Sequence, residues 1–187
     1  RPGIKHESKI IKILEEKIDV LYNIKMESKK REKIYHTLPP IYSENSRVLI
    51  LGSLPSPKSR EVKMYYGNKS NRFWKTLFAV FGESAVTNEE KAAFILRHRL
   101  ALWDVIASCE IAGAADSSIR NAEPNDFGLI FRAADIRAVF TTGRTAAALY
   151  KKFTGRESFC LPSPSGANCA VSFSALVESY KKITEYL

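Results

Sequence analysis

The segment from residue 52 to residue 71 contains side chains that can hold a flat ring and act on it. Tyr66 offers an aromatic face for stacking, and the carboxamide of Asn71 can both donate and accept hydrogen bonds. A plainer interpretation is that Ser70 or Asn71 caps a helix that begins at Arg72. These residue types therefore indicate either a binding site for a flat ring or an ordinary helix start.

Positive charge is concentrated around the same segment. Residues 47–75 contain seven Lys and Arg against a single acid, Glu61. The whole chain has 29 Lys and Arg against 20 Asp and Glu, which gives a net charge of +9. Such an excess favours an anionic partner such as nucleic acid, although many basic proteins bind none.

Two other stretches carry residues suited to binding. Residues 162–168 read Pro-Ser-Pro-Ser-Gly-Ala-Asn and directly follow the apolar run 158–161. Gly143 and Arg144 stand where a predicted strand meets a predicted helix, so a phosphate could be held there, and a plain turn is an equally good interpretation. Loops that follow the strands of an open α/β sheet are where ligand crevices form.

Regular elements must bring these loops together. Short apolar runs predict buried strands at 48–51, 100–106, 136–141 and 158–161. Apolar residues at three- and four-residue steps, with caps such as Gly82 and the Thr87–Glu90 capping box, predict helices at 8–24, 73–81, 87–96, 125–131, 145–153 and 171–186. In the helix after Thr87 we expect Ala93, Phe94 and Leu96 to face inward, and residues 112–124 to be irregular.

The alternation of strands and helices predicts an α/β fold. We expect a three-layer α/β/α sandwich around a four-stranded parallel sheet, with an extra N-terminal helix. Residues 1–35 would form a helical extension, and residues 36–187 the α/β domain. Both unusual loops would then lie at one edge of the sheet and could converge on one crevice.

Several classes of site and location are disfavoured. Cys109, Cys160 and Cys169 contain no close pair, so we expect buried thiols rather than disulfides or a metal cluster. The three histidines show no metal-ligand spacing, and we expect them to be surface or packing residues, with no metal and no cofactor. No apolar segment is long enough to span a membrane and the charged start is not a secretory signal, so a cytoplasmic protein is expected.

The motifs together resemble one family. Gly-Ser-Leu-Pro-Ser at 52–56, Tyr-Tyr-Gly at 65–67 and Asn-Arg-Phe-Trp at 71–74 are similar to the first motif of the uracil-DNA glycosylase superfamily, in its DNA-deoxyinosine (hypoxanthine-DNA) branch. Segments 101–105, 116–119 and 161–163 resemble the same branch. The resemblance runs from about His36 to the C-terminus, which makes residues 36–187 a glycosylase-like domain.

The resemblance implies roles for individual residues. It assigns the main catalytic role to Asn71, stacking on the extruded base to Tyr66, and entry into the duplex to the loop 163–168. The expected base-binding pocket consists of Gly52, Ser53, Leu54, Pro55, Ser56 and Tyr66. The expected DNA contacts are Lys58, Ser59, Arg144, Ser163, Pro164, Ser165, Gly166, Ala167 and Asn168.

The sequence departs from the family pattern at three places. Asn68-Lys69 stands where relatives usually carry His-Pro, which affects the bracing of the loop ahead of Asn71. Pro164-Ser165-Gly166 is similar to the loop of mismatch-specific uracil glycosylases, whereas Leu54 replaces the catalytic Asn of those enzymes. The first two departures leave substrate choice open, and Leu54 favours the deoxyinosine branch.

The chemistry expected from these residues is hydrolysis of an N-glycosidic bond. Backbone amides near residues 53–56 and the Asn71 carboxamide could stabilise the departing base, and Asn71 could orient water without being a strong base. Asp104 is expected to be a capping or solvent-facing acid, and the role of Asp116 is left open. No lysine beside the motif points to a Schiff-base lyase, so a monofunctional enzyme is expected.

Three functions are weighed. The leading hypothesis is a monomeric glycosylase that removes hypoxanthine from double-stranded or single-stranded DNA. The second is a glycosylase that prefers uracil in mismatches, as the Pro164-Ser165-Gly166 run suggests. The third is a nucleic-acid-binding module that has lost its chemistry, for which Asn68-Lys69 and the positive charge are the motive.

Overall fold

The computed structural model of the 187-residue chain describes residues 17, 31–113 and 116–187. The predicted helix over residues 8–24 lies, apart from Lys17, outside these described residues. None of the helices within the described ranges is long and apolar enough to cross a membrane.

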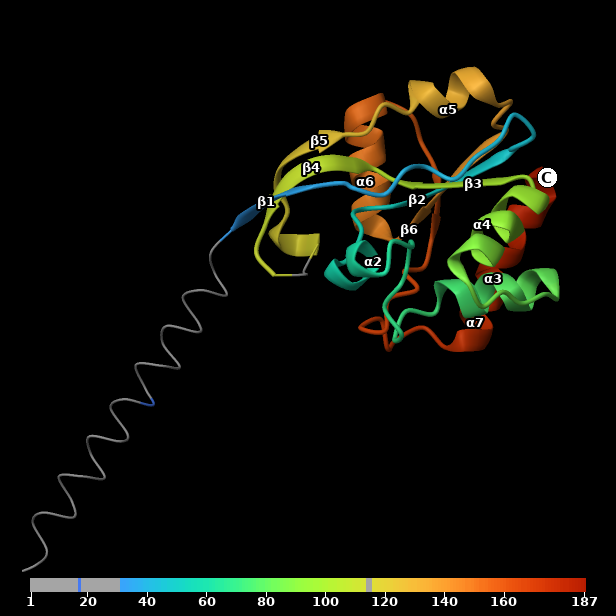
Figure 1. The fold of residues 1–187 in the computed structure, drawn as a ribbon, viewed down its shortest axis with the longest axis horizontal. Helices are drawn as coiled ribbons and strands as arrows, with labels where there is room; N and C mark the ends of the chain where they lie inside the picture. Colours follow the sequence, from blue (N-terminus) through green and yellow to red (C-terminus); the bar gives the residue numbers. More distant parts are fainter. Residues whose placement is uncertain (1–16, 18–30, 114–115) are drawn as a thin grey trace, which may run out of the picture.

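A four-stranded parallel sheet forms the centre of the domain, as predicted (Figure 1). Its strands, in spatial order, are β3 (Leu100–Asp104), β2 (Val48–Gly52), β6 (Ala138–Thr142) and β7 (Phe159–Leu161). Every residue of β2 and β3 is buried. A strand covered on both faces needs apolar side chains throughout, which is why these segments read as continuous apolar runs.

Helices cover both faces of this sheet, so the three-layer α/β/α prediction is confirmed. The helices after residue 56 are α2 (Pro57–Glu61), α3 (Phe73–Phe81), α4 (Asn88–Arg97), α5 (Gly128–Ala133), α6 (Arg144–Thr154) and α7 (Phe173–Lys181), with short 3-10 segments η1 (Asp116–Ser118) and η2 (Lys182–Tyr186). Helices α3, α4 and α7 gather together, apart from α5 and α6 (Figure 1). The ring of Phe73 meets Tyr180 of α7 on one side, and Phe127 meets Tyr150 of α6 on the other.

The caps that the sequence predicted for α3 and α4 are present. Gly82 ends α3 with a φ of 69°, a left-handed conformation that suits glycine. Thr87 and Glu90 form the capping box of α4. The inward face of α4 was predicted wrongly in part, since Phe94 and Ile95 are buried and Ala93 and Leu96 are exposed. A helix whose end lies at the edge of the core turns a narrower stripe inward than its apolar spacing suggests.

A second, antiparallel sheet was not predicted. It consists of β1 (Glu32–Tyr35), β4 (Ile106–Ile111) and β5 (Arg120–Pro124), in the order β1-β4-β5. Strand β4 follows β3 after Val105, so the expected strand 100–106 divides between two sheets, and the expected irregular stretch 112–124 contains β5. Strand β1 also brings the end of the predicted 1–35 extension into contact with the domain.

The strand ends fix the place of the loops. Gly52 lies opposite Asp104 in the β2–β3 pairing, and Thr142 lies opposite Leu161 in the β6–β7 pairing. The chain beyond β2 stays close to the start of β4, because the N–H of Ile106 donates to the Ser53 carbonyl at 3.1 Å. All four strands therefore deliver their following residues to one edge of the sheet.

Candidate functional site

A cavity of about 650 Å³ opens at this edge of the sheet. It is bordered by the loop after β2, by the segment before α3 and by the loop after β7, so the two loops singled out in the sequence do converge. Most of the predicted site residues line it: Gly52, Ser53, Leu54, Pro55, Ser56, Ser59, Tyr66, Asn71, Ser163, Pro164, Ser165, Gly166, Ala167 and Asn168. Lys58 and Arg144 do not.

The carboxamide of Asn71 is held in one orientation by the backbone. Its Oδ1 accepts a hydrogen bond from the N–H of Phe73 at 2.9 Å. A backbone N–H can only donate, so the oxygen must face the helix and the Nδ2 group is left as the free end. Within the described part of the chain this Nδ2 has no partner, and Asn71 lines the cavity. The N-cap residue of α3 is Arg72, so the predicted cap at Ser70 or Asn71 is displaced by one residue or more, but Asn71 accepts the first N–H of the helix and provides a donor at the site.

Tyr66 presents one face of its ring to the cavity. The other face stacks on Phe73, with ring centroids 3.7 Å apart and an interplanar angle of 16°. The Tyr66 hydroxyl lies 2.9 Å from Thr142 Oγ1. The backbone φ of Tyr66 is 53°, which is unusual for a residue with a large side chain. Burial raises the pKa of the Tyr66 hydroxyl well above 10.0, so the phenol stays neutral. The ring is a rigid platform braced from behind.

Arg72 ties the loop after β7 to the start of α3. Its backbone N–H donates to the Pro164 carbonyl at 2.9 Å. Its guanidinium donates to the carbonyls of Val171 at 2.6 Å, Asn168 at 2.8 Å and Ser165 at 3.3 Å. A single residue next to Asn71 therefore holds the second loop at four points.

The segment ahead of Asn71 is braced by its own hydrogen bonds and approaches the 163–168 loop closely at Gly166. Asn68, one of the departures from the expected family pattern, accepts hydrogen bonds at Oδ1 from the N–H and the hydroxyl of Ser70, both at 3.0 Å. Its carbonyl also accepts the N–H of Asn71 at 2.9 Å, so this departure from the family pattern still braces the loop. A Cβ on Gly166 would lie 2.8 Å from the Ser70 carbonyl oxygen, which leaves no room for a side chain.

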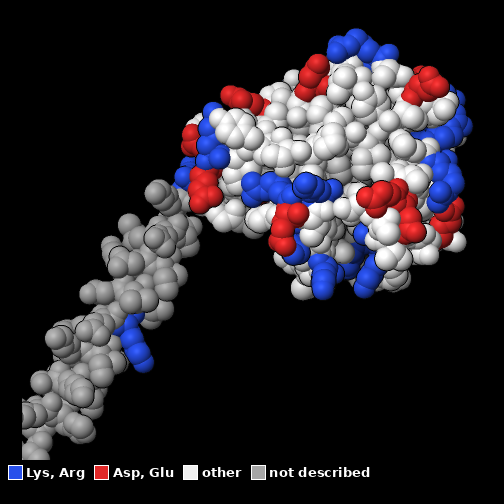
Figure 2. All heavy atoms as spheres, viewed as in Figure 1, with Lys and Arg blue, Asp and Glu red and all other residues white. Residues whose placement is uncertain are grey.

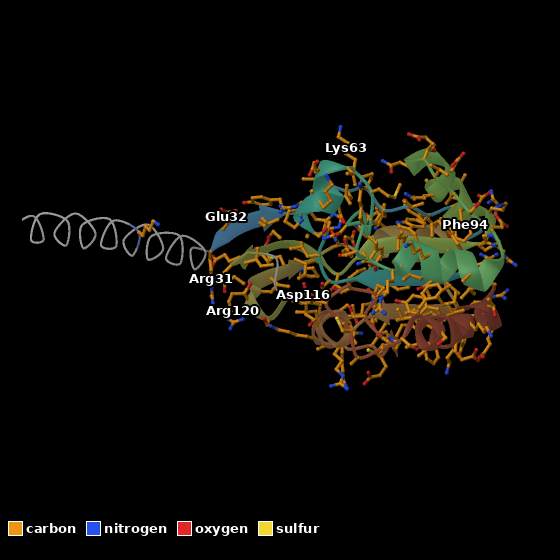
Figure 3. The ribbon with its side chains drawn as sticks, turned by 90° about the horizontal axis from the view of Figure 1, so that it is seen from below. Arg31, Glu32, Lys63, Phe94, Asp116 and Arg120 are labelled. Carbon is orange, nitrogen blue, oxygen red and sulfur yellow. The ribbon has the colours of Figure 1, made fainter. Side chains whose placement is uncertain are left out.

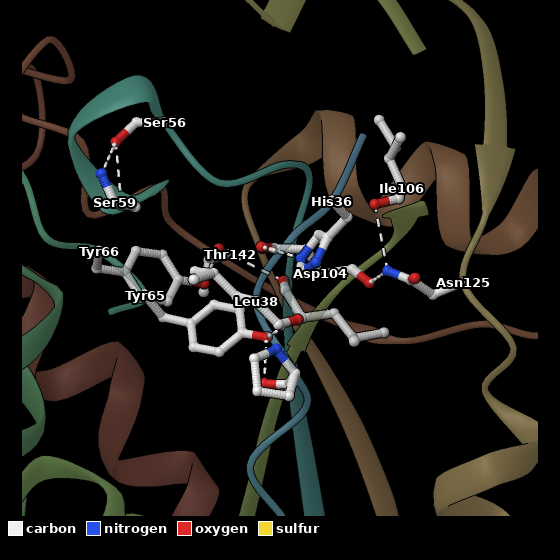
Figure 4. Close-up of polar contacts among 12 residues, drawn as sticks. His36, Leu38, Ser56, Ser59, Tyr65, Tyr66, Asp104, Ile106, Asn125 and Thr142 are labelled. Atoms are coloured by element: carbon white, nitrogen blue, oxygen red, sulfur yellow. Dashed lines mark hydrogen bonds and ion pairs between the residues drawn. The ribbon is translucent and has the colours of Figure 1, made fainter. Parts of the chain in front are cut away.

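Asp104 differs from its prediction as a capping or solvent-facing acid. Only 3% of the residue is exposed, and its Oδ2 lies 3.0 Å from Nε2 of His36, a residue expected to be a surface or packing histidine (Figure 4). Burial raises the pKa of Asp104, and the His36 contact counteracts that rise. The two residues are 68 positions apart, so no local sequence signal could have paired them. Asp104 lies on the cavity wall.

Asp116, whose role the sequence left open, also lines the cavity. Its Oδ2 accepts a 2.6 Å hydrogen bond from the Ser53 hydroxyl, which lowers the pKa of Asp116 against a larger rise caused by burial. In Figure 3 Asp116 lies toward the end of the domain that carries Glu32 and Arg120, far from Phe94. Asp116 belongs to η1, between β4 and β5, and Ile34 of β1 and Ile111 of β4 also line the cavity, so this end of the domain forms one wall of the site.

Two predicted DNA contacts, Lys58 and Arg144, lie outside the cavity. Lys58 pairs with Glu61 at 2.6 Å on α2, and Arg144 is exposed at the start of α6. The amide of the neighbouring Gly143 donates to the Leu161 carbonyl at 2.9 Å, so that amide is not available to a phosphate, and a phosphate contact of Arg144 stays a prediction. Figure 2 shows Lys and Arg side chains over α2 and around the loops below it.

The cysteines follow the sequence interpretation only in part. Cys109 is buried, but Cys160 and Cys169 are exposed, so the prediction of three buried thiols is wrong for two of them. Among residues 31–113 and 116–187, His, Cys, Asp and Glu form no group of three or more that could hold a metal ion.

Comparisons with known proteins point to one family. The profile of the Uracil DNA glycosylase superfamily matches residues 39–186. A protein of Methanosarcina acetivorans named hypoxanthine DNA glycosylase is 38% identical over 135 residues, which cover 70% of this chain and 85% of that protein. A protein of the same name from Methanosarcina barkeri is 32% identical over 135 residues, with the same shares covered.

A solved structure supports the fold. The solution NMR structure of a candidate uracil DNA glycosylase from Methanosarcina acetivorans superimposes with a TM-score of 0.68 at 32% sequence identity. The match covers 81% of this chain and 99% of that one.

Proposed function

The chain belongs to the Uracil DNA glycosylase superfamily, and from that premise we propose that it is a DNA glycosylase that removes hypoxanthine from deoxyinosine sites. The names of the two Methanosarcina relatives support hypoxanthine as the base. The observation that carries the proposal is that the Asn71 amide, the Tyr66 ring and the 163–168 loop border a single cavity.

A base stacked inside a duplex cannot reach such a cavity. The nucleotide must be turned out, at a cost of a few kcal/mol that is smaller when the base pairs poorly, as a deaminated base does. The exposed face of Tyr66 would then stack on the flat base. The 163–168 loop, fixed by Arg72, would occupy the gap left in the helix. The basic side chains near α2 would contact the DNA backbone.

The reaction breaks the C1′–N9 bond between deoxyribose and hypoxanthine. The bonding electrons leave with the base, positive charge develops on the sugar, and the oxygen of water adds to C1′. Water keeps one proton in the new C1′ hydroxyl group and gives up the other, which neutralises the departing base, so that an abasic site and free hypoxanthine result. Because no step needs an attached protein group, the proposed enzyme is a monofunctional hydrolase.

Asn71 acts in this scheme as a donor. Its Oδ1 is already engaged by the N–H of Phe73, so the Nδ2 group is the end that can meet the substrate. A preorganised N–H aimed at the charge that develops on a leaving group is worth about 3 kcal/mol in related systems. Asn71 has no basic group with which to deprotonate water, so stabilisation of the departing base is its main contribution.

A duplex with one deoxyinosine in a labelled strand tests the proposal. After incubation with the protein and then alkali, the labelled strand should be cut at that site. The Asn71→Ala variant should lose at least 100-fold in single-turnover rate. Asn88→Ala is a suitable control, because Asn88 donates to the Val62 carbonyl and does not line the cavity. An uncut duplex, or full activity in Asn71→Ala, would refute the proposal.

A second candidate is preference for uracil. It is motivated by the Pro164-Ser165-Gly166 run, all of which lines the cavity, and by the name of the solved structural neighbour. A panel of duplexes that carry hypoxanthine, uracil or xanthine separates the two candidates by their rates. Binding with a steep salt dependence but without any abasic product would instead indicate a module without chemistry.

A further inference from the structure

The wall of the cavity contains a carboxylate oxygen that has no hydrogen-bond partner among the described residues. One oxygen of Asp104, Oδ2, lies 3.0 Å from His36 Nε2. The other, Oδ1, has no hydrogen-bond partner among the described residues. The Asp104 side chain as a whole is 5% exposed, and Asp104 lines the cavity. An acceptor that has no protein partner and lies on a cavity wall can receive a hydrogen bond from a donor on a bound ligand.

The position of this oxygen relative to the site is well defined. An ideal Cβ on Gly52 would lie 2.2 Å from Asp104 Oδ1 and 3.0 Å from the Tyr66 hydroxyl. The Asp104 carboxylate and the Tyr66 hydroxyl therefore both lie next to the Cα of Gly52, where a side chain would otherwise be. Gly52, Tyr66 and Asp104 all line the cavity. Figure 4 shows Asp104 beside His36, with Tyr66 and Thr142 to one side and Asn125 to the other.

We infer that Asp104, oriented by His36, determines which base is accepted by receiving a hydrogen bond from the ring N–H of a deaminated base. This inference rests on the proposed function. Hypoxanthine, xanthine and uracil each carry an N–H beside a carbonyl group on the pairing edge. Adenine and cytosine have a lone pair on the corresponding nitrogen, which a carboxylate oxygen repels. Asp104 thus separates the products of deamination from the two bases that give rise to hypoxanthine and uracil.

The contact with His36 engages Oδ2 of Asp104 and leaves only Oδ1 as an acceptor for a ligand. When Asp104 is ionised, Nε2 of His36 must carry the proton that it shares with Oδ2. The His36 side chain is 3% exposed, so its position is fixed by packing. The carboxylate cannot turn without losing this contact. Oδ1 is therefore held toward the cavity before a base arrives, which is the preorganisation that selective recognition needs.

The Asp104→Asn variant tests the inference because His36 also dictates how the new amide lies. With the proton kept on Nε2, as it is beside the ionised carboxylate, the amide oxygen faces Nε2–H and the NH2 group replaces Oδ1 at the cavity. An acceptor becomes a donor with little change in shape. The variant should therefore lose rate on deoxyinosine and gain relative rate on a base with a lone pair at that nitrogen.

The measurement is a ratio of single-turnover rates on two duplexes, one with deoxyinosine and one with deoxynebularine, whose purine base has a lone pair at N1. The intrinsic lability of each base cancels when the ratio of the variant is divided by that of wild type. Loss of a hydrogen bond to a charged group changes a rate by about 10- to 100-fold. The rate on deoxyinosine divided by the rate on deoxynebularine should therefore fall by this factor in Asp104→Asn. Should that variant not fold, Asp104→Ser removes the carboxylate without added volume, and the ratio should fall likewise.

Asn125→Ala is the matched control. Asn125 Nδ2 donates to the backbone carbonyls of Asp104 at 2.9 Å and Ile106 at 3.2 Å, but Asn125 does not line the cavity. This variant should lower stability and leave the ratio unchanged. If Asp104→Asn slows both duplexes equally, or if Asn125→Ala moves the ratio as much, the inference is wrong and the glycosylase proposal stands. If wild type cuts neither duplex, the proposed function fails, and the inference fails with it.

Discussion

The molecule contains two histidine–carboxylate pairs in very different surroundings. His36 and Asp104 lie 3.0 Å apart on the cavity wall, with side chains 3% and 5% exposed. His98 and Glu83 lie 2.9 Å apart beside α4, with side chains 18% and 34% exposed, and Arg97 also contacts Glu83. The rings of Phe81 and Phe94 pack on His98.

The two carboxyl groups respond in opposite directions. Burial raises the pKa of Asp104, whereas the hydrogen bond from Arg97 lowers the pKa of Glu83. A similar contact distance therefore accompanies opposite shifts, and desolvation decides the sign. Burial of the His36–Asp104 pair costs free energy, which is typical of groups that a functional site uses. The His98–Glu83 pair links the end of α4 to the residue that follows the C-cap of α3.

The largest difference between the two pairs should appear in stability. His36→Ala leaves a buried carboxylate without its partner and should lower the free energy of unfolding by about 3 kcal/mol. Glu83→Ala removes a contact that water can replace and should change it far less. Urea denaturation at pH 7 measures both. Equal losses would mean that the cavity admits enough water to erase the contrast.

Two glycines near the same regions provide the next test. Gly166→Ala places a methyl group against Ser70, so the loop must move away from Asn71, and the rate on deoxyinosine should fall about 10-fold or more because catalytic geometry is intolerant of small shifts. Gly82→Ala, between Phe81 and Glu83, meets no atom within 4 Å but has a φ of 69°. It should cost about 1 kcal/mol of stability and leave the rate unchanged. A rate loss in Gly82→Ala would contradict the separation of the two regions.

A smaller effect should appear in the dependence on pH. The groups that face Asp104 are His36, Asp116, Tyr65 and Tyr66. Since folding raises the pKa of Asp104 above 3.8, ionised Asp104 opposes folding at neutral pH, and this cost disappears as the pH falls through the raised pKa.

Glu83 should behave in the opposite way. Its lowered pKa means that its stabilisation is present above 4.5 and is lost as the pH falls through the folded-state value. Melting curves from pH 3 to pH 7 should therefore show a shallower acid loss in Glu83→Gln and a steeper one in Asp104→Asn, each relative to wild type. Identical slopes in the two variants would remove the basis for treating the pairs differently.

The sequence predicts the parallel strands and the loops of the site better than it predicts the small sheet and the Asp104–His36 contact. Apolar runs located all four parallel strands, and the punctuation by Ser, Pro and Gly located both loops, because these signals are local. The small sheet was missed, since β5 is exposed along most of its length and is a strand only through its pairing with β4. The contact between Asp104 and His36 was missed for a similar reason, because only the folded chain brings the two residues together.

The prediction for Asn71 shows where local reasoning works. For Asn71 the sequence offered a place at the helix start and a place in the chemistry as alternatives. In the structure the carboxamide oxygen accepts the N–H of Phe73 at the start of α3, and the carboxamide nitrogen is left for a substrate. The interpretation of Tyr66 gains its support from Phe73 and Thr142, which no pattern in the sequence connects with it. The assigned catalytic and binding roles remain predictions until the variants are measured.

The four hydrogen bonds of Arg72 imply a division of labour between protein and DNA. A loop fastened so firmly already has its working shape in the free protein, so the adjustment during encounter is made by the duplex. We therefore expect sites along the DNA to be sorted by how readily each base leaves its stack, and only afterwards by the groups that it meets inside the protein.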